Sequence, residues 1–299
     1  MSSNDTKKAL SILDAGGVVG IPTETVYGLA AKIDSPEGID KIFTTKERPD
    51  FDPLIVHVES IEQALKCTSS WPLHAELLAN AFWPGPLTMV LPKASHISSK
   101  ITSGLETVGL RCPNHPLTLE LIHYSGPLAA PSANRFGKTS PTQKAHVDSE
   151  FNGEVFTIDG GACEIGIEST VIGIFEDHIE VYRPGAITPS MIKNITDIDV
   201  VVKESPVSPG HLKHHYMPDL PMYLSYEAQP QELKDIHFAL IELSSDPNIA
   251  ARELYQKMRE AAQEPNAKAI VLLKKPDQQG ELWEGIWNRV KKAITKELI

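Results

Sequence analysis

Four arginines in the first 200 residues are candidates for chemistry because of where they occur. Arg48, Arg111, Arg135 and Arg183 all lie in stretches rich in Pro, Gly, Ser or Asn. The planar guanidinium group binds phosphate or carboxylate through two parallel hydrogen bonds, so arginines placed in this way are candidate anion clamps. The alternative is that each one pairs with an internal carboxylate.

The segment "TKERPDFDPLIVHV", residues 45–58, combines Lys46 and Arg48 with Pro49, which disfavours helix at Arg48. Two cations at the end of a helix could simply complement its negative end. They could equally form a phosphate clamp on a loop stiffened by proline. His57 lies inside the strand predicted next, where a single histidine is usually a core residue.

Arg111 lies among apolar neighbours in "TVGLRCPNHP", residues 107–116. A buried arginine without an anion is costly, so Arg111 should pair either with an internal carboxylate or with a ligand.

Three further segments carry small polar side chains. The loop "GPLAAPSANRFGKTSPT" (126–142) could form an anion-binding concavity, or a capped turn that starts a helix. "GIPTETVYGLAA" (20–31) could provide a polar rim at a strand end, or threonines that satisfy backbone groups. "GIESTVIG" (166–173) leads Glu168, Ser169 and Thr170 into a strand.

The elements that must position these residues alternate between strand and helix. Short apolar runs predict strands within 18–23, 53–58, 87–92 and 107–113, whereas 36–47, 72–82 and 115–124 read as helices. The segments 169–175 and 178–185 predict a hairpin. Crossovers together with a hairpin indicate an α/β domain with a twisted mixed sheet and flanking helices, covering residues 1–202.

Composition changes at the end of this domain. Residues 203–222 are rich in proline and contain three histidines, which predicts a linker. Residues 223–299 then read strand, helix, strand, helix, and so predict a small α/β domain with a parallel sheet of Rossmann-like topology. This domain has no glycine-rich phosphate turn.

The overall composition excludes several classes of protein. With 299 residues, 41% hydrophobic residues and a formal charge of −11, the chain does not resemble a basic nucleic-acid coat. It has no apolar run of bilayer length and no secretory signal at its N-terminus. Its three cysteines do not suggest a disulfide framework. We therefore expect a cytoplasmic protein that does not contact membranes.

Taken together, these segments resemble a known family. "PTETVYGL", "KERP" with "PLIVH", "VGLRCPNHP", "PSANRFGKTSPT", "GIESTVI" and "YRPG" occur in the order found in the YrdC-like domain. Lys-x-Arg together with Ser-x-Asn is the hallmark pair of that family. The linker "SPGHLKHHYMP" resembles the corresponding segment of the two-domain L-threonylcarbamoyladenylate synthases. The resemblance covers residues 7 to about 218.

The resemblance implies a nucleotidyltransferase, with a YrdC-like domain followed by the small Rossmann-like domain. L-threonine, bicarbonate and ATP would give threonylcarbamoyl-AMP and diphosphate, with Mg²⁺ accompanying ATP. A tRNA threonylcarbamoyltransferase would then use the product for tRNA modification, and a contact with RNA is possible. No metal ligand is expected from the protein itself.

The family pattern also implies roles for residues. Lys46 and Arg48 would be catalytic. The ATP site would contain Lys46, Arg48, Asp52, Thr107, Ser132, Asn134, Ser140, Arg183 and Tyr216. The threonine site would contain Thr25, His57, Arg111, Ala130 and Thr170. Two positions depart from the pattern. Asp52 replaces the usual Asn and would repel phosphates, and Phe136 replaces a small residue.

Two alternatives remain at this level. The chain could be a non-catalytic YrdC-like module that binds structured RNA, although its net acidity weighs against this. It could instead adenylate a different carbamoyl compound, as in carbamoyl-transfer maturation proteins. Those proteins carry a zinc-finger unit that the three cysteines do not suggest.

Overall fold

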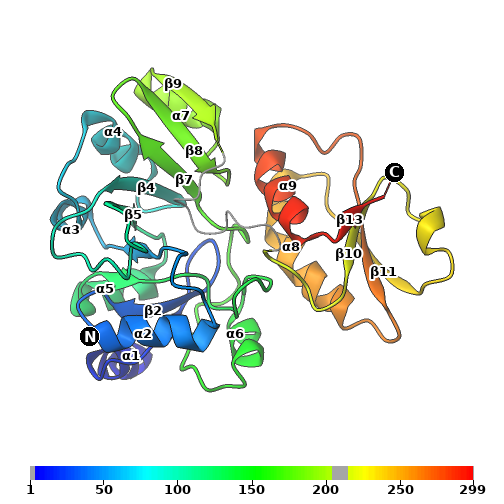
Figure 1. Cartoon of the computed structure of the whole chain (residues 1–299), viewed down its shortest axis with the longest axis horizontal. Coiled ribbons are helices and arrows are strands. Elements are labelled where there is room, and N and C mark those ends of the chain that lie inside the picture. Colours follow the sequence, from blue (N-terminus) through cyan, green and yellow to red (C-terminus); the bar gives the residue numbers. More distant parts are fainter. Residues whose placement is uncertain (1–3, 204–214, 299) are drawn as a thin grey trace.

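Two sheets organise the chain in a computed structural model that describes residues 4–203 and 215–298 (Figure 1). The larger sheet has the strand order β1-β2-β6-β3-β5-β4-β7-β8-β9. Its strands are β1 Val19–Ile21, β2 Gly28–Lys32, β3 Ile55–His57, β4 Leu87–Pro92, β5 Thr107–Arg111, β6 Leu128–Ala129, β7 Thr170–Ile174, β8 His178–Arg183 and β9 Asp199–Val202.

This sheet is mixed, as the sequence predicts. β3/β5, β4/β7 and β8/β9 pair in parallel, and the remaining neighbours are antiparallel. β7 and β8 form the predicted hairpin. The helices of this domain are α1 Asn4–Asp14, α2 Pro36–Lys46, α3 Ile61–Cys67, α4 Leu73–Phe82, α5 Pro116–Ser125, α6 Lys144–Glu150 and α7 Pro189–Thr196.

Helix α2 shows how local sequence positions the site. The Ser35 side chain accepts a hydrogen bond from the Gly38 N–H, and Pro36 occupies the first turn, which is a favoured helix start. The helix ends where Glu47 adopts a left-handed conformation. Ile42 and Phe43 anchor the helix in the core. As a result, Lys46 is its last residue and Arg48 follows the Glu47 cap.

The smaller sheet is wholly parallel, with the order β11-β12-β10-β13. Its strands are β10 Met222–Ser225, β11 Phe238–Glu242, β12 Ala269–Leu273 and β13 Lys296–Glu297. The helices are α8 Pro247–Ala262 and α9 Glu281–Ala293, with a short 3₁₀ turn at Gln231–Leu233. The sequence predicts the parallel sheet and both helices but not β10 or β13.

The two domains meet through α8 and α9, which lie on the side of the small sheet that faces the large domain (Figure 1). β10 begins at Met222, where the predicted linker ends, and residues 204–214 of that linker lie outside the described part of the chain.

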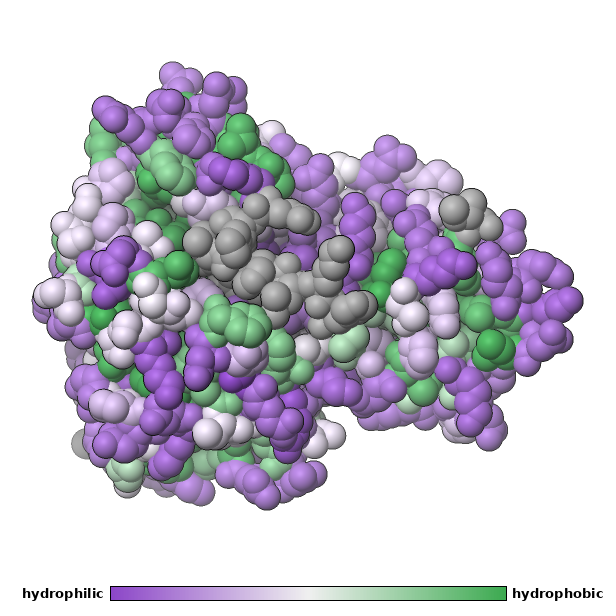
Figure 2. Space-filling model, viewed as in Figure 1, coloured by the Kyte–Doolittle hydropathy of each residue, from purple (hydrophilic) through white to green (hydrophobic). Residues whose placement is uncertain are grey.

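The surface gives no sign of a membrane span. Within residues 4–203 and 215–298, no helix is both long and apolar enough to cross a bilayer. Hydrophilic residues predominate on the face shown in Figure 2, with apolar ones interspersed.

Candidate active site

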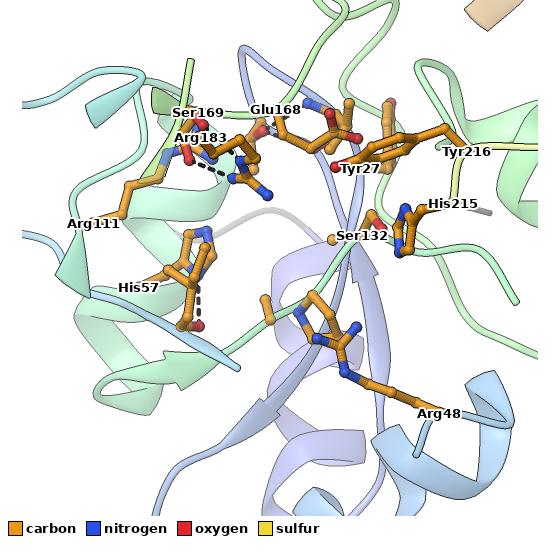
Figure 3. A pocket seen from close by; sticks show the side chains of 16 residues that line it. Tyr27, Arg48, His57, Arg111, Ser132, Glu168, Ser169, Arg183, His215 and Tyr216 are labelled. Carbon is orange, nitrogen blue, oxygen red and sulfur yellow. Dashed lines mark hydrogen bonds between the residues drawn. The ribbon is translucent and has the colours of Figure 1, made fainter. Parts of the chain in front are cut away.

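A polar pocket forms where several strand ends and loops of the large domain meet the chain that enters the small domain (Figure 3). Its lining comes from segments that are far apart in the sequence. The residues are Thr23, Val26, Tyr27, Gly28, Arg48, Ile55, His57, Arg111, Ala130, Pro131, Ser132, Glu168, Ser169, Arg183, His215 and Tyr216. The pocket therefore collects residues from every segment that the sequence marks as chemical.

The hallmark residues lie together on one side of the pocket. The Lys46 ammonium donates hydrogen bonds to the backbone carbonyl of Ser132, at 2.6 Å, and to that of Asn134. The amide side chain of Asn134 donates to the carbonyls of Arg135 and Lys138, which closes the loop on itself. Lys46 and Asn134 thus brace the loop behind the pocket, whereas Ser132 lines it.

Lys46 is almost wholly buried, at 1% exposure. Burial lowers the pKa of its ammonium group well below the usual value, and the charge of Arg48 acts in the same direction. A phosphate entering the pocket would favour the charged form again, because an opposite charge stabilises it.

Arg48 lines the pocket and is held by its own loop. Its Nη2 lies 2.9 Å from Asp52 Oδ2, and its Nε and Nη2 donate to the carbonyls of Asp52 and Pro53. Asp52 is fully buried and does not line the pocket. The carboxylate expected to repel phosphates therefore pairs with an arginine that lines the pocket.

Arg111 finds an internal partner, one of the two possibilities left open by the sequence. Its Nη2 lies 2.7 Å from Glu24 Oε1, and both side chains are buried. Glu24 also accepts a hydrogen bond from the Asn114 N–H. Glu24 fixes the guanidinium group of Arg111 against the pocket, which Arg111 still lines.

His57 lies beside Arg111 at the same end of the pocket (Figure 3). Its Nδ1 lies 3.2 Å from the Ile55 carbonyl. Burial, aided by the positive charge of Arg111, lowers the pKa of His57 to about 3. The imidazole is therefore neutral near pH 7 and serves as a shape and hydrogen-bonding element, not as a cation.

Arg183 lies across the pocket from Arg48 (Figure 3). Its Nε and Nη2 donate to the backbone carbonyl and the hydroxyl of Ser169, at 3.0 and 3.1 Å. The Ser169 hydroxyl also lies 2.8 Å from that of Thr88. Two guanidinium groups thus face one cavity, an arrangement suited to a polyanion.

Tyr216 closes the side of the pocket nearest the small domain (Figure 3). It adopts a left-handed backbone conformation, with φ of 65°. The neighbouring N–H groups of His215 and Met217 donate to the carbonyls of Lys292 and Gly137 respectively, so the segment bridges both domains. Burial, together with the charge of Glu168, raises the pKa of Tyr216 to about 12.

Several predicted site residues lie behind the pocket instead of on its surface. The Thr25 hydroxyl lies 2.9 Å from that of Thr23. The Thr170 and Ser140 hydroxyls donate to the Ile187 carbonyl and the Glu168 carboxylate. Thr107 lines a second cavity that shares only Ile55 with the pocket. Of the predicted residues, Arg48, His57, Arg111, Ala130, Ser132, Arg183 and Tyr216 line the pocket.

The pocket also contains residues to which the sequence assigned no role. Thr23, Tyr27, Glu168 and Ser169 occur in the polar segments, so their types and positions could have signalled them. His215 could have been found among the linker histidines. Nothing local marks the residues of α8 and α9 that reach Glu168.

The site holds few metal ligands. Over the described ranges 4–203 and 215–298, no group of three or more His, Cys, Asp and Glu side chains could hold a metal ion. Glu168 contributes a carboxylate to the pocket lining, and hydrogen bonds from Ser140 and Tyr255 already occupy it.

Comparison with known proteins finds family matches to both domains. Residues 11–185 match the Sua5_yciO_yrdC family, described as "Telomere recombination", and residues 187–294 match the "Threonylcarbamoyl-AMP synthase, C-terminal domain". The chain is 42% identical to the threonylcarbamoyl-AMP synthase of Bacillus subtilis over 79% of its own length and 71% of that protein. It is 43% identical to that of Pyrococcus abyssi over 68% of its own length and 58% of that protein.

A solved structure extends the likeness to both domains. The structure of P. abyssi Sua5 complexed with L-threonine has a TM-score of 0.88 and 33% identity, and the match covers 97% of this chain and 95% of that one. The chain belongs to the Sua5/YciO/YrdC family, in its two-domain form with a threonylcarbamoyl-AMP synthase C-terminal domain.

Proposed function

We propose that this protein makes threonylcarbamoyl-AMP and diphosphate from L-threonine, bicarbonate and ATP. The observation that carries the proposal is the convergence of Arg48, Arg111 and Arg183 on one cavity, with Lys46 bracing its wall. Relatives named threonylcarbamoyl-AMP synthase, and a threonine complex of one of them, support this choice of substrates.

The reaction needs placement and charge compensation more than proton transfer. The threonine amine captures carbon dioxide or bicarbonate to give a carbamate. A carbamate oxygen then attacks the α-phosphorus of ATP, the bond to the bridging oxygen breaks, and diphosphate leaves. Bringing an anionic carbamate to a triphosphate requires fixed cations, as in other transfers at phosphorus.

The chain's own residues divide this task. Arg48 and Arg183 bind the phosphates from opposite sides of the pocket, and Lys46 holds the Ser132 loop so that the nucleotide can approach. Arg111, oriented by Glu24, binds the threonine carboxylate, with neutral His57 beside it. Tyr216 covers the pocket and limits the access of water to the mixed anhydride product.

Mg²⁺ enters this proposal with ATP. When bound, it neutralises phosphate charge. The pocket fits a metal that is carried mostly by phosphate and water oxygens, because Asp52 is paired away from the cavity and the Glu168 carboxylate already accepts other hydrogen bonds. The product would pass to a tRNA threonylcarbamoyltransferase, and the cytoplasmic location remains a prediction.

The direct test is synthesis by the purified protein. With ATP, labelled bicarbonate and L-threonine, we expect diphosphate and labelled threonylcarbamoyl-AMP in equal amounts, and neither when threonine is omitted. Absence of both products from the complete mixture would refute the proposal. RNA binding with a steep salt dependence but no ATP turnover would instead indicate an RNA-binding module.

A binding measurement tests the shared cavity. Threonine should bind more tightly when ATP is present, because the two ligands occupy adjacent parts of one pocket. Titration calorimetry with and without ATP measures this difference. Equal threonine affinities in the two titrations would argue that the ligands bind separately.

A further inference from the structure

The small domain inserts an arginine into the wall of the pocket. Arg289, on α9, is 0% exposed. Its Nε lies 3.0 Å from Glu168 Oε2, and its Nη2 donates to the Glu168 carbonyl at 3.0 Å. It also donates to the Pro184 and Gly285 carbonyls. Glu168 lines the pocket, so Arg289 is linked to the pocket through this one residue.

A second residue of the small domain reaches the same carboxylate. The Tyr255 hydroxyl, on α8, donates to Glu168 at 3.0 Å from Oε2 and 3.2 Å from Oε1. Within the large domain, the Ser140 hydroxyl donates to Oε1 at 2.5 Å. The rings of Tyr216 and Tyr255 lie 5.9 Å apart, and the Arg289 guanidinium lies 6.0 Å from the Tyr216 ring. The carboxylate is therefore bonded from both domains.

This arrangement has an electrostatic consequence. Burial alone would raise the pKa of Glu168, but the charges of Arg289 and Arg183 lower it to about 2, so the group is an anion near pH 7. A free carboxylate facing the pocket would repel a triphosphate. With Arg289 against it, the ion pair carries no net charge, and the carboxylate still accepts a hydrogen bond from Ser140.

We propose that Arg289 is a positioning residue of the ATP site, which acts through Glu168 by fixing and neutralising its carboxylate. The small domain thereby completes the electrostatics of a pocket whose charged lining residues belong to the large domain. The inference rests on the proposed use of ATP, and it assigns to the small domain a task beyond holding the linker.

The test compares two arginines that both bond from the small domain to backbone of the large one. Arg289→Met removes the cation, and we expect it to weaken ATP binding by at least about tenfold. Arg252→Met is the matched control, because Arg252 Nε donates to the Glu164 carbonyl at 2.7 Å but does not touch Glu168. It should bind ATP like the wild type. Calorimetric titration with ATP provides both affinities.

A second substitution separates charge from structure. If Arg289 acts by neutralising Glu168, the double variant Arg289→Met/Glu168→Gln should bind ATP within about threefold of Glu168→Gln alone. If Arg289 acts through its bonds to Pro184 and Gly285, the double variant stays as weak as Arg289→Met, and the proposal is wrong. Wild-type affinity in Arg289→Met would refute it as well.

Two further readouts keep the test decisive. ATP affinity of Arg289→Met, divided by that of the wild type, should increase as pH falls from 7 to 5, because loss of the cation raises the pKa of Glu168 and its protonation removes the repulsion. A constant ratio would count against the proposal. If Arg289→Met does not fold, the double variant leaves no charge unpaired, and its affinity relative to Glu168→Gln decides the question alone.

Failure of this inference differs from failure of the proposed function. If the wild type binds ATP and makes threonylcarbamoyl-AMP but Arg289→Met behaves like Arg252→Met, only the role of Arg289 is refuted. If the wild type binds ATP but makes no product with threonine and bicarbonate, the proposed function fails, while the binding comparison still tests Arg289.

Discussion

Two buried ion pairs in the pocket wall are built in opposite ways. Arg48 and Asp52 lie four residues apart on one loop, and the same loop supplies carbonyls for the arginine. Glu168 and Arg289 are 121 residues apart and belong to different domains. The first pair needs only the fold of a short segment, whereas the second exists only while α9 is docked. The pocket wall thus contains one ion pair that depends on a single loop and another that forms only when the two domains are docked.

Arg111 and Glu24 form an intermediate case, because both belong to the large domain but come from separate strand ends. In all three pairs the carboxylate fixes an arginine, or is fixed by one, at the edge of the cavity. The pairs differ in which charge faces the ligand. Arg48 and Arg111 line the pocket as cations, whereas Glu168 lines it as an anion.

The largest effect is expected from removing the local cations. Lys46→Ala and Arg48→Ala should each reduce turnover by at least about tenfold. Arg48→Ala removes positive charge that faces the phosphates, and Lys46→Ala removes the brace of the Ser132 loop. The measurement is the rate of diphosphate release at saturating threonine.

Arg135→Ala is the control for these variants, because Arg135 is partly exposed, pairs with Glu47 and does not line the pocket. It should retain nearly the wild-type rate. Wild-type rates in both Lys46→Ala and Arg48→Ala would contradict the comparison, since neither the Arg48–Asp52 pair nor the Lys46 brace would then contribute to catalysis.

A smaller and more selective effect is expected at the intermediate pair. Arg111→Lys keeps the charge but cannot form two parallel hydrogen bonds, so KM for threonine should rise about tenfold. KM for ATP should change much less. Steady-state kinetics with each substrate varied in turn gives both values, and an equal rise in both would contradict the assignment of Arg111 to threonine.

The stability of the fold should fall in two phases as pH is lowered, the first from two buried histidines. The pKa values of His57 and His215 are lowered to about 3, mainly by burial. Between pH 6.5 and about 3 the unfolded chain binds more protons than the folded one, so stability falls as pH falls. From pH 6.5 to 5.5 the loss should be about 1 kcal/mol for each histidine.

The Glu168–Arg289 pair should produce a second loss of stability, at lower pH. The pKa of Glu168 is about 2 in the fold, so its stabilisation is present above its usual value of 4.5 and is lost between pH 4.5 and 2. Urea unfolding at a series of pH values measures both phases. His57→Gln should reduce the slope above pH 4.5 without abolishing it, because His215 still contributes, and should leave the Glu168 phase in place. An unchanged slope in this variant would contradict the assignment.

The smallest effect is expected from Asp52→Asn. The backbone carbonyls of residues 52 and 53 would still accept hydrogen bonds from Arg48, so ATP affinity should change by less than about threefold. A loss of tenfold or more, measured by the same titration, would show that the charge of Asp52 is needed and that the local pair is not self-contained.

Local features of the fold were largely predictable. Ser35 and Pro36 predict the start of α2, and the apolar runs predict β4 and the β7–β8 hairpin, because capping and periodicity are set by neighbouring residues. β2, β6 and β13 were not predicted. β6 and β13 have only two residues each and pair with strands distant in sequence, so local pattern carries little signal for them.

The same distinction between local and long-range features applies to the candidate site. The sequence by itself determined which residue types could bind anions, and it placed Arg48 directly after a helix because Pro49 disfavours helix there. Only the tertiary structure decided that Lys46 braces the Ser132 loop from behind, that Glu24 is the partner of Arg111, and that Arg289 neutralises Glu168. Burial and charge pairing depend on which distant segments pack together, and the pattern within one segment does not specify its neighbours.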